Sequence, residues 1–433
     1  MSPESIEAVA QAATRAFRER RFNDAAAGYE RCVAMNPKAP AFHFNLGTAR
    51  EFGGDLPGAI KAYLSAWNLD PSDGRLALFA GAALAAAGRR EDAAILFSLG
   101  DAVDPAVRQA KDRPHFDSEF RRRSETADRV MRELFTNLHE DAVAEFERHL
   151  ADSGDGLPPD LSRVRRAIWV QTHARPFSYR AKKQQPTLLY LPDLPATAIF
   201  PRERLHWAGA VEAATQAARE EYVEALRQGA AMSPYVDPKT RAPIWHALRG
   251  NMDWSSLHLY KMAQETPLAR HFPRTLEALA AAEIVRIDGR PVELFFSRLR
   301  PGTHIPPHFG GSNNRITIHL PLIVPGECSI RVGDEFHAWR EGELFAFDDS
   351  FEHEAWNQAD SDRVVLIFES PHPDLSAVER QCVEFAIERR GQKAADLPPV
   401  PVRLSYRRRR RGGHRQFRLP HHCRERGPPD RNR

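Results

Sequence analysis

The chain has 433 residues, 42% of them hydrophobic, and a formal net charge of +3. This length predicts two or three domains, with enough apolar residues to fill their cores. The four Cys residues are widely separated, which favours reduced thiols over a disulfide framework. No stretch reaches the roughly 18 apolar residues of a membrane span, and the N-terminus has no apolar signal core. We therefore expect a cytoplasmic protein without a membrane partner.

Residues 1–106 carry an internal repeat. The dipeptides Asn36-Pro37, Asp70-Pro71 and Asp104-Pro105 recur every 34 residues. The same period links small and aromatic residues: Ala13, Gly47 and Gly81; Ala25, Ala59 and Ala93; Tyr29, Tyr63 and Phe97. The pattern resembles three tetratricopeptide repeats, in which small residues let two helices approach and Pro ends the second helix. A generic helical bundle is the alternative. Such arrays typically receive a protein or peptide partner on their concave face.

Residues 107–184 are expected to form a helical connector that packs between two domains. The segment from Arg121 to Leu150 has helix-compatible periodicity, and Ser153–Arg163 then interrupts it with Gly and Pro residues. No chemical motif is evident in this connector.

Residues 185–392 change character, because the apolar runs shorten and alternate with polar residues. SIRVGDEFHAW, GELFAFDD and RVVLIFE are typical of strands, and turn residues separate them. Many short strands predict a double-layered barrel. The expected fold class is thus α+β and multidomain, with a helical array before a β-sheet barrel.

Residues 393–433 are expected to form a disordered tail rich in Pro and Arg. From Arg403 onward, twelve Arg against Glu425 and Asp430 give a net charge of +10, so residues 1–402 carry −7 of the total of +3. Such a run is usually solvated. Contact with nucleic acid through phosphate groups is the less favoured alternative, and a non-native extension is another.

Four blocks stand in order in the strand-rich region: LRPGTHIPPHFGGSNNRITIHLPL, SIRVGDEFHAW, FDDSFEHEAWN and RVVLIFESPHPDL. Together they resemble the aspartyl/asparaginyl β-hydroxylase family of Fe(II)- and 2-oxoglutarate-dependent oxygenases. The resemblance implies a double-stranded β-helix, or jelly roll, for residues 185–392. It also implies Fe(II) as the cofactor, with 2-oxoglutarate and O2 as cosubstrates.

His308 and His353 are the candidate metal ligands and catalytic residues. Non-haem iron sites usually add a carboxylate, which lies two residues beyond the first His on the same strand face. Here that position is Gly310. The resembled family is known for a site of two His with water in the vacant place, so the departure agrees with the resemblance. A lone His in an apolar strand is more often structural, but the ordered blocks favour metal binding.

Other polar residues near these His are given structural roles. Asp348 and Asp349 are expected to cap a turn, because Asp accepts backbone hydrogen bonds well there. Glu352 and Glu354 should point away from His353 if the segment is extended. Three further His are read as surface or supporting residues: His304, His337 and His372.

The resemblance implies that Arg363 and Ser297 hold the distal carboxylate of 2-oxoglutarate, with His319 near the end that chelates iron. Arg363 opens an apolar strand, and Arg grips a carboxylate with two parallel hydrogen bonds. Its alternative is an ion pair with Asp360 or Asp362. Thr317 stands where some family members carry a second Arg.

In the strand RITIHLPL, Ile316, Ile318 and Leu320 share one face. The opposite face carries three polar residues: Arg315, Thr317 and His319. A barrel interior with polar groups usually binds a ligand.

The implied activity is hydroxylation of the β-carbon of an aspartyl or asparaginyl group in a peptide, protein or carrier-bound or small amino-acid substrate. A repeat scaffold with a degenerate, non-catalytic metal-binding barrel is the main alternative. A metal-dependent barrel with a different reaction is a third. The sequence does not choose among the substrates.

Overall fold

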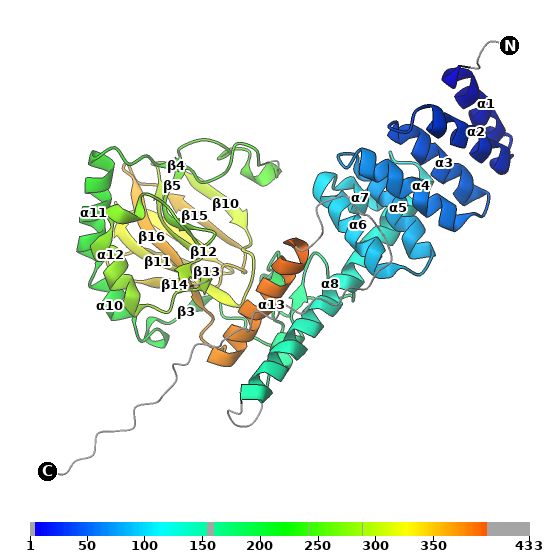
Figure 1. The fold of residues 1–433 in the computed structure, drawn as a ribbon. Helices are drawn as coiled ribbons and strands as arrows, with labels where there is room; N and C mark the ends of the chain where they lie inside the picture. The colour runs from blue at the N-terminus through cyan, green and yellow to red at the C-terminus, as the bar shows by residue number, and fades with distance from the viewer. Residues whose placement is uncertain (1–4, 154–159, 241, 288, 396–433) are drawn as a thin grey trace.

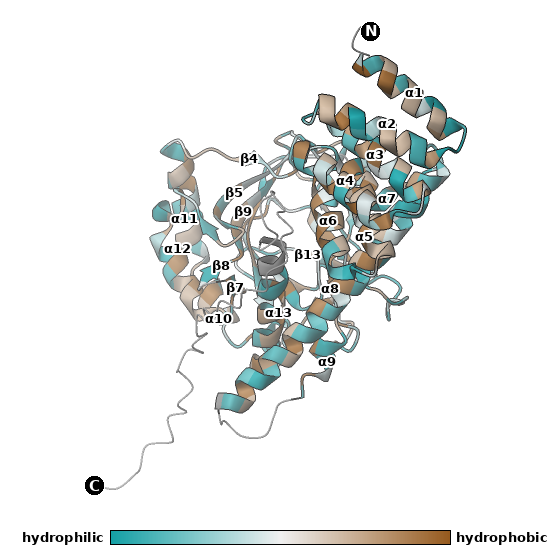
Figure 2. Ribbon diagram, turned by 45° about the vertical axis from the view of Figure 1, so that its right-hand side comes forward, coloured by the Kyte–Doolittle hydropathy of each residue, from teal (hydrophilic) through white to brown (hydrophobic). Residues whose placement is uncertain are grey.

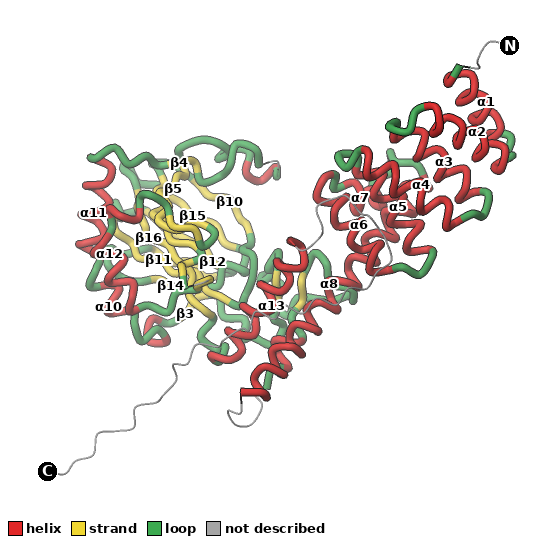
Figure 3. The backbone as a smooth tube through the Cα atoms, in the orientation of Figure 1, coloured by secondary structure: helices red, strands yellow, loops and turns green. Residues whose placement is uncertain are grey.

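The protein combines a helical array with a two-sheet β domain (Figure 1). The computed structural model describes residues 5–153, 160–240, 242–287 and 289–395. The Arg-rich tail lies outside these residues from position 396 onward. Helices occupy the N-terminal part of the chain, and most strands gather in the C-terminal half (Figure 3). This arrangement confirms the predicted fold class.

Six helices form the array, and each packs against the next along the chain. Their bounds are α1 (Ile6–Arg18), α2 (Phe22–Met35), α3 (Pro40–Phe52), α4 (Leu56–Leu69), α5 (Gly74–Ala86) and α6 (Arg90–Val103). A Cβ on Gly47 would lie 2.6 Å from the Tyr63 ring, and one on Gly81 would lie 2.5 Å from the Phe97 ring. In both repeats a Gly of the first helix therefore contacts an aromatic ring of the second helix, and the two contacts recur 34 residues apart, as the sequence period predicted.

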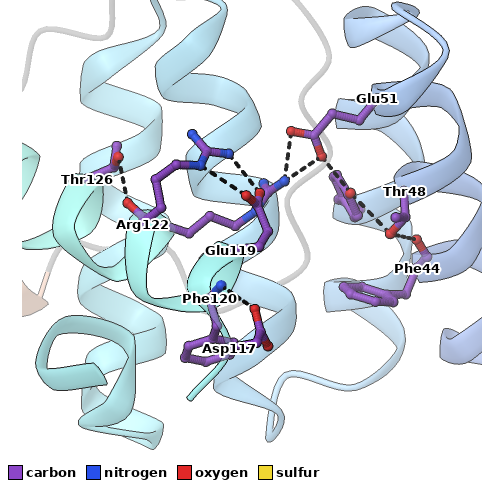
Figure 4. A network of polar contacts seen from close by, with 10 residues as sticks. Phe44, Thr48, Glu51, Asp117, Glu119, Phe120, Arg122 and Thr126 are labelled. Atoms are coloured by element: carbon purple, nitrogen blue, oxygen red, sulfur yellow. Dashed lines mark hydrogen bonds and ion pairs between the residues drawn. The ribbon is translucent and has the colours of Figure 1, made fainter. Parts of the chain in front are cut away.

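A single helix of 36 residues, α8 (Ser118–Ser153), connects the array to the β domain. Its first turns pack against α5, α6 and the short helix α7 (Ala106–Gln109). The guanidinium of Arg123, which is 2% exposed, donates to both carboxylate oxygens of Glu51 at 2.9 Å and lies over the Phe79 ring. Figure 4 shows this network, in which Glu119 also joins. The start of α8 is thus fixed to the middle of the array.

The second half of α8 belongs to a different core. It packs against the C-terminal helix α13 (Ala377–Ala395). The core that they share also includes the helix α9 (Ser162–Arg165) and the two-stranded sheet of β1 (Ile168–Trp169) and β2 (Leu189–Tyr190). Its buried members include Val143, Phe146, Val164, Trp169, Leu189, Leu191, Val383 and Phe385. Residues on both sides of position 185 therefore build one hydrophobic core.

Eight consecutive strands form the jelly roll. They are β9 (Glu293–Leu299), β10 (His304–His308), β11 (Arg315–Ile323), β12 (Cys328–Val332), β13 (Glu335–Ala338), β14 (Phe345–Phe347), β15 (His353–Asn357) and β16 (Arg363–Pro371). All pairings among them are antiparallel. One sheet has the order β10-β15-β12-β13, and the larger one contains β14-β11-β16-β9. This alternation of consecutive strands between two sheets is the topology of a double-stranded β-helix.

Further strands widen the larger sheet. β3 (Ile199–Phe200) pairs with β14, and β5 (Trp254–Lys261) pairs with β9. The short strands β4 (Ser233–Pro234) and β6 (Gln264–Glu265) pair with β5. β7 (Arg286–Ile287) and β8 (Arg290–Pro291) form a separate two-stranded sheet. The larger sheet can therefore line a longer cavity than a four-stranded layer.

Three helices cover the outer face of the larger sheet: α10 (Ala208–Glu212), α11 (Thr215–Arg227) and α12 (Pro273–Ala278) (Figure 1). Ile316, Ile318 and Leu320 of β11 point into this core. The inner face is left for the smaller sheet, with a second core at the contact. Both hydrophilic and hydrophobic residues occur along the helices (Figure 2), and no helix in the described part of the chain is long and apolar enough to cross a membrane.

Candidate active site

A cavity of about 530 Å³ lies between the two sheets. All five residues predicted from the sequence line it: Ser297, His308, His319, His353 and Arg363. Ser297, His319 and Arg363 come from the larger sheet, whereas His308 and His353 come from paired strands of the smaller sheet. The fold thus brings together residues from five strands that the sequence separates.

His308 and His353 face each other across β10 and β15, with ring centroids 4.1 Å apart. Each Nδ1 lies near a backbone carbonyl two residues earlier, at 2.8 Å from Pro306 and 2.9 Å from Phe351. A carbonyl only accepts, so each Nδ1 carries the hydrogen and each Nε2 keeps a lone pair. Burial lowers the pKa of His308 to about 3 and that of His353 to about 4. Both rings are therefore neutral at physiological pH, in the form that binds metals.

The place of a third ligand is filled in a way the sequence did not indicate. A Cβ on Gly310 would lie 2.2 Å from the Cγ of Asp349, so the Asp349 carboxylate occupies this space. The Thr317 hydroxyl also bonds this carboxylate, and burial raises the pKa of Asp349 to about 6. In the described residues, no group of three or more His, Cys, Asp and Glu is arranged to hold a metal ion. The candidate site consequently rests on two His.

The two neighbouring Asp residues have different roles. Asp348 accepts from the Ser350 backbone N–H at 2.9 Å and from Gln184 at 2.7 Å, so its predicted role in a turn is confirmed. The same prediction was wrong for Asp349, which lines the cavity. The turn at this point directs adjacent side chains in opposite directions, and propensity alone does not say which one faces inward.

Arg363 is 1% exposed, and its Nε and Nη1 have no hydrogen-bond partner. The expected alternative, an ion pair with Asp362, does not form: that carboxylate lies 3.7 Å from Arg298 instead. The Arg363 guanidinium lies over the Trp339 ring at 4.5 Å, and burial lowers its pKa to about 10. It remains a cation at neutral pH. A buried cation with unused donors is costly unless an anion reaches it.

Ser297 and His319 add polar groups to the same wall. The Ser297 hydroxyl accepts from the Trp254 indole N–H at 3.1 Å and so keeps its own hydrogen to donate. His319 has an unpartnered Nδ1, and burial together with Arg363 lowers its pKa well below the usual value. Thr317 and His319 both line the cavity, which confirms the predicted alternation along β11.

The remaining residues discussed from the sequence lie elsewhere. Glu352 and Glu354 point away from His353 as predicted, and both pair with Arg331. His304 is on the surface and bonds Glu354 at 2.9 Å. His372 is fully buried beside Phe200, so of the two predicted roles, surface or supporting residue, the surface one was wrong. His337 stacks on Phe345 at 4.0 Å.

Sequence reasoning missed several residues of the cavity wall. The Trp245 ring lies 4.9 Å from that of His308, and Tyr235 stacks on Trp254 at 4.0 Å. Trp245 ends a 3-10 helix of three residues, η3 (Pro243–Trp245), which is too short for any periodicity to have placed it. Glu369 was accessible to prediction, because alternation along β16 carries the inward face from Arg363 to Glu369.

The β domain is similar in sequence to known proteins. The family model described as aspartyl/asparaginyl β-hydroxylase matches residues 212–373. The aspartyl/asparaginyl β-hydroxylase of Mus musculus is 38% identical over 136 residues, which are 31% of this chain and 18% of that protein. The chain thus spans less than a fifth of the length of the mouse protein.

A second relative, aspartate β-hydroxylase domain-containing protein 2 of Rattus norvegicus, matches over a larger share of its own length. It is 31% identical over 264 residues, which are 60% of this chain and 71% of that protein. Among solved structures, the TPR domain of Arabidopsis OM64 is 16% identical with a TM-score of 0.24, and the match covers 28% of this chain and 93% of that one. The ordered motifs, the cavity and these relatives show that the chain belongs to the aspartyl/asparaginyl β-hydroxylase family of 2-oxoglutarate oxygenases, which typically depend on Fe(II).

Proposed function

We propose that this protein is a dioxygenase that uses Fe(II), 2-oxoglutarate and O2 to hydroxylate the β-carbon of an aspartyl or asparaginyl group. The observation that carries the proposal is the buried Arg363, whose unused donors face the same cavity as two neutral His. A cavity with metal ligands at one point and an unpaired cation at another suits a chelating dicarboxylate.

The two His fit an iron ion by chemistry and by orientation. Each Nδ1 is held by a backbone carbonyl, which leaves each Nε2 to donate a lone pair. Both are neutral, so no proton has to leave before the metal binds. His308 and His353 would hold the ion, and bound iron supplies the oxidative chemistry by activating dioxygen as 2-oxoglutarate is decarboxylated.

Arg363 and Ser297 would bind the distal carboxylate of 2-oxoglutarate. The guanidinium offers two unpaired N–H groups, and the Ser297 hydroxyl has a hydrogen to donate. The neutral His319 would lie near the end of 2-oxoglutarate that binds the metal. These three groups orient the cosubstrate before the reaction, which lowers the entropic cost of reaching the reactive geometry.

The aromatic residues around His308 limit access of water. Trp245 and Trp254 approach its ring at centroid distances of 4.9 and 6.4 Å, and Phe347 lies 5.3 Å from His353. An apolar surrounding strengthens electrostatic interactions and protects reactive species from water. The substrate would enter from the side of Tyr235, whose ring is partly exposed.

We further propose that the substrate is a peptide, a protein or a carrier-bound amino acid that also contacts the repeat array. Arrays of this type offer a surface for extended partners, and binding energy from remote parts of a substrate can accelerate the reaction. The free concave face is restricted, because Arg123 and Phe120 of α8 already lie against Phe79. Arg123 also binds Glu51 of α3 in the second repeat, so the surface proposed for the substrate lies toward α1 and α2.

The test uses the purified full chain, incubated with Fe(II), 2-oxoglutarate and O2 and a library of peptides and free amino acids. We expect one equivalent of bound iron, formation of succinate, and a gain of one oxygen atom in a substrate containing Asp or Asn. A protein that binds no iron and forms no succinate would instead be a non-catalytic scaffold. Oxidation of a substrate without formation of succinate would indicate a different metal-dependent reaction.

A further inference from the structure

The two loops next to the candidate metal ligands are joined by a segment that enters the β domain from the connector. One loop, residues 309–314, follows His308, and the other, residues 348–352, precedes His353. Residues 183–189, called the joining segment from here on, run into β2 and contact both loops. The segment crosses position 185, the predicted boundary between the connector and the β domain.

The joining segment binds the loop of residues 309–314 mainly through its backbone. The N–H groups of Leu188 and Leu189 donate to the Gly311 carbonyl at 2.8 and 3.0 Å. Thr187 donates to the Gly310 carbonyl from its backbone N–H at 3.0 Å and from its hydroxyl at 3.1 Å. These bonds fix the residues that closely follow the first candidate metal ligand.

Gln184 binds the loop of residues 348–352 with both its backbone and its side chain. It is paired with Phe351 in an antiparallel bridge, and its two neighbours make backbone hydrogen bonds of 2.8 Å with the same loop. The side-chain amide of Gln184 donates to the Asp348 carboxylate at 2.7 Å. The Phe351 carbonyl in turn lies 2.9 Å from Nδ1 of His353. Gln184 is therefore paired with the residue that orients the second metal ligand.

The contact between Gln184 and Asp348 is buried, with the two residues 1% and 0% exposed. The second Asp348 oxygen accepts from the Ser350 backbone N–H at 2.9 Å, so this carboxylate ties the turn to the joining segment. The next residue, Asp349, contacts the other loop, because its backbone carbonyl accepts from the Gly310 N–H at 2.6 Å. A shift of the turn would therefore move both loops.

The joining segment is itself anchored at both ends. Upstream, the turn of residues 171–173 accepts hydrogen bonds at 3.0, 3.1 and 2.8 Å from three helices, donated by Arg108 of α7, Arg132 of α8 and Arg390 of α13. Downstream, the chain continues into β2, which pairs with β1. A support that is fixed at both ends can hold the loops in one position.

We infer that Gln184 is a positioning residue for the metal site. Through Asp348 and the joining segment it keeps His308 and His353 in the relative position that lets both bind one ion. The inference rests on the proposed function, because it requires an ion between the two His. Residues that orient metal ligands typically contribute about 10- to 100-fold to metal affinity. With only two protein ligands, no third side chain compensates for a displacement of either one.

The experiment measures metal binding without turnover. Fe(II) and Co(II) are titrated separately into the full chain in the absence of oxygen, and the visible spectrum of bound Co(II) reports its coordination. Gln184→Met keeps the length of the side chain and removes its donor. The exchange variant, Gln184→Glu with Asp348→Asn, restores the hydrogen bond with donor and acceptor reversed. Gln185→Met is the matched control, because the Gln185 side chain donates to the Lys182 carbonyl, outside both loops.

We expect Gln184→Met to bind both ions about tenfold more weakly, with a changed Co(II) spectrum. The exchange variant should recover most of the affinity, and Gln185→Met should bind as the unaltered protein does. A role in stability alone would lower the melting temperature but leave the affinity and the Co(II) spectrum of the folded protein unchanged. That result would overturn the inference, as would failure of the exchange variant to recover affinity. If Gln184→Met does not fold, Gln184→Asn, which is shorter by one methylene, takes its place with the same expected direction.

The proposed function is tested separately by oxygen gain in a substrate. Weaker metal binding by Gln184→Met, with no oxygen gain by the unaltered protein, would contradict the function alone. Equal metal affinity of Gln184→Met and the unaltered protein would contradict the inference alone. An unaltered protein that binds neither ion would overturn both.

Discussion

The repeat array and the β domain reach their cores in different ways. In the array, the contact of Gly47 with Tyr63 lies within one 34-residue repeat, and the next repeat copies it with Gly81 and Phe97. In the β domain, the cavity joins residues that range from Tyr235 to Glu369. A defect in the array therefore stays local, whereas a defect in the β domain reaches the site through several strands.

The largest expected effect is the loss of the metal site in the β domain while the repeat array is unchanged. His308→Ala or His353→Ala removes one of two metal ligands, so iron binding and turnover should both be lost while the array stays folded. Iron content and far-UV circular dichroism measure the two outcomes. His304→Ala is the control, since this His is on the same strand as His308 but on the surface. Retained activity in either cavity variant would reject the metal assignment.

The second prediction tests whether the regions can be separated at all. A chain that begins at Gln185 loses α8, α9 and β1, and it exposes Leu189, Leu191, Val383 and Phe385. Burying one such side chain contributes about 1.5–3 kcal/mol, so we expect this chain to aggregate. A chain that begins at Asp117 keeps α8 and should be more soluble and bind iron. Comparable solubility and melting temperature of the two would show that the shared core is dispensable.

A third change affects only the buried end of the cavity. Arg363→Lys replaces a planar fork by a point charge, and the loss of about 2 kcal/mol corresponds to roughly thirtyfold weaker binding of 2-oxoglutarate. Titration with 2-oxoglutarate in the absence of oxygen measures it. Arg298→Lys on β9 is the control, because Arg298 bonds Ser255 and lies near Asp362 rather than lining the cavity. An unchanged affinity in folded Arg363→Lys would place the cosubstrate elsewhere.

The fourth change concerns the space beside the two His. Gly310→Asp would add the ligand common in other iron sites, but its Cβ would lie 2.2 Å from the Asp349 Cγ. We expect about tenfold weaker iron binding, because the neighbouring carboxylate must move. The double variant Gly310→Asp with Asp349→Gly removes the clash and should recover affinity. Iron titrations compare the two variants. Tighter iron binding by Gly310→Asp than by the unaltered protein would contradict the predicted clash with Asp349.

The smallest effect should remain in the array. Gly47→Ala forces a methyl group against the Tyr63 ring, at a cost of about 1–3 kcal/mol for overpacking. The melting temperature of the array should fall by several degrees, with iron affinity unchanged. Ser65→Ala on the exposed side of α4 is the control. A simultaneous loss of iron affinity would show that the two regions unfold together.

Periodicity explains which features the sequence could reveal. A period of 34 located the array, and a period of two placed Thr317 and His319 opposite Ile316 and Ile318. The ordered blocks brought His308, His353 and Arg363 into consideration. These are regular patterns, and each specifies a direction for the side chain.

The remaining features depend on irregular geometry and could not be predicted from the sequence. Asp349 was expected to act like Asp348, although the turn directs it into the cavity. Trp245 reaches His308 from a single 3-10 turn, and His372 is buried by packing against Phe200. The boundary at position 185 also concealed a core formed with α13, since residues so distant in sequence share no pattern. Tertiary contacts decide all four.

The continuous helix α8 fixes the distance between the repeat array and the cavity. Its 36 residues span about 54 Å at about 1.5 Å per residue, and both of its halves are packed. A substrate held by the array and by the cavity at once must therefore have a docking segment and a target residue at a matching separation. For such a substrate the second contact occurs at a high effective concentration, and for a shorter one it does not occur. Inserting a flexible loop into α8 should broaden the range of accepted spacings and lower the rate for the best one.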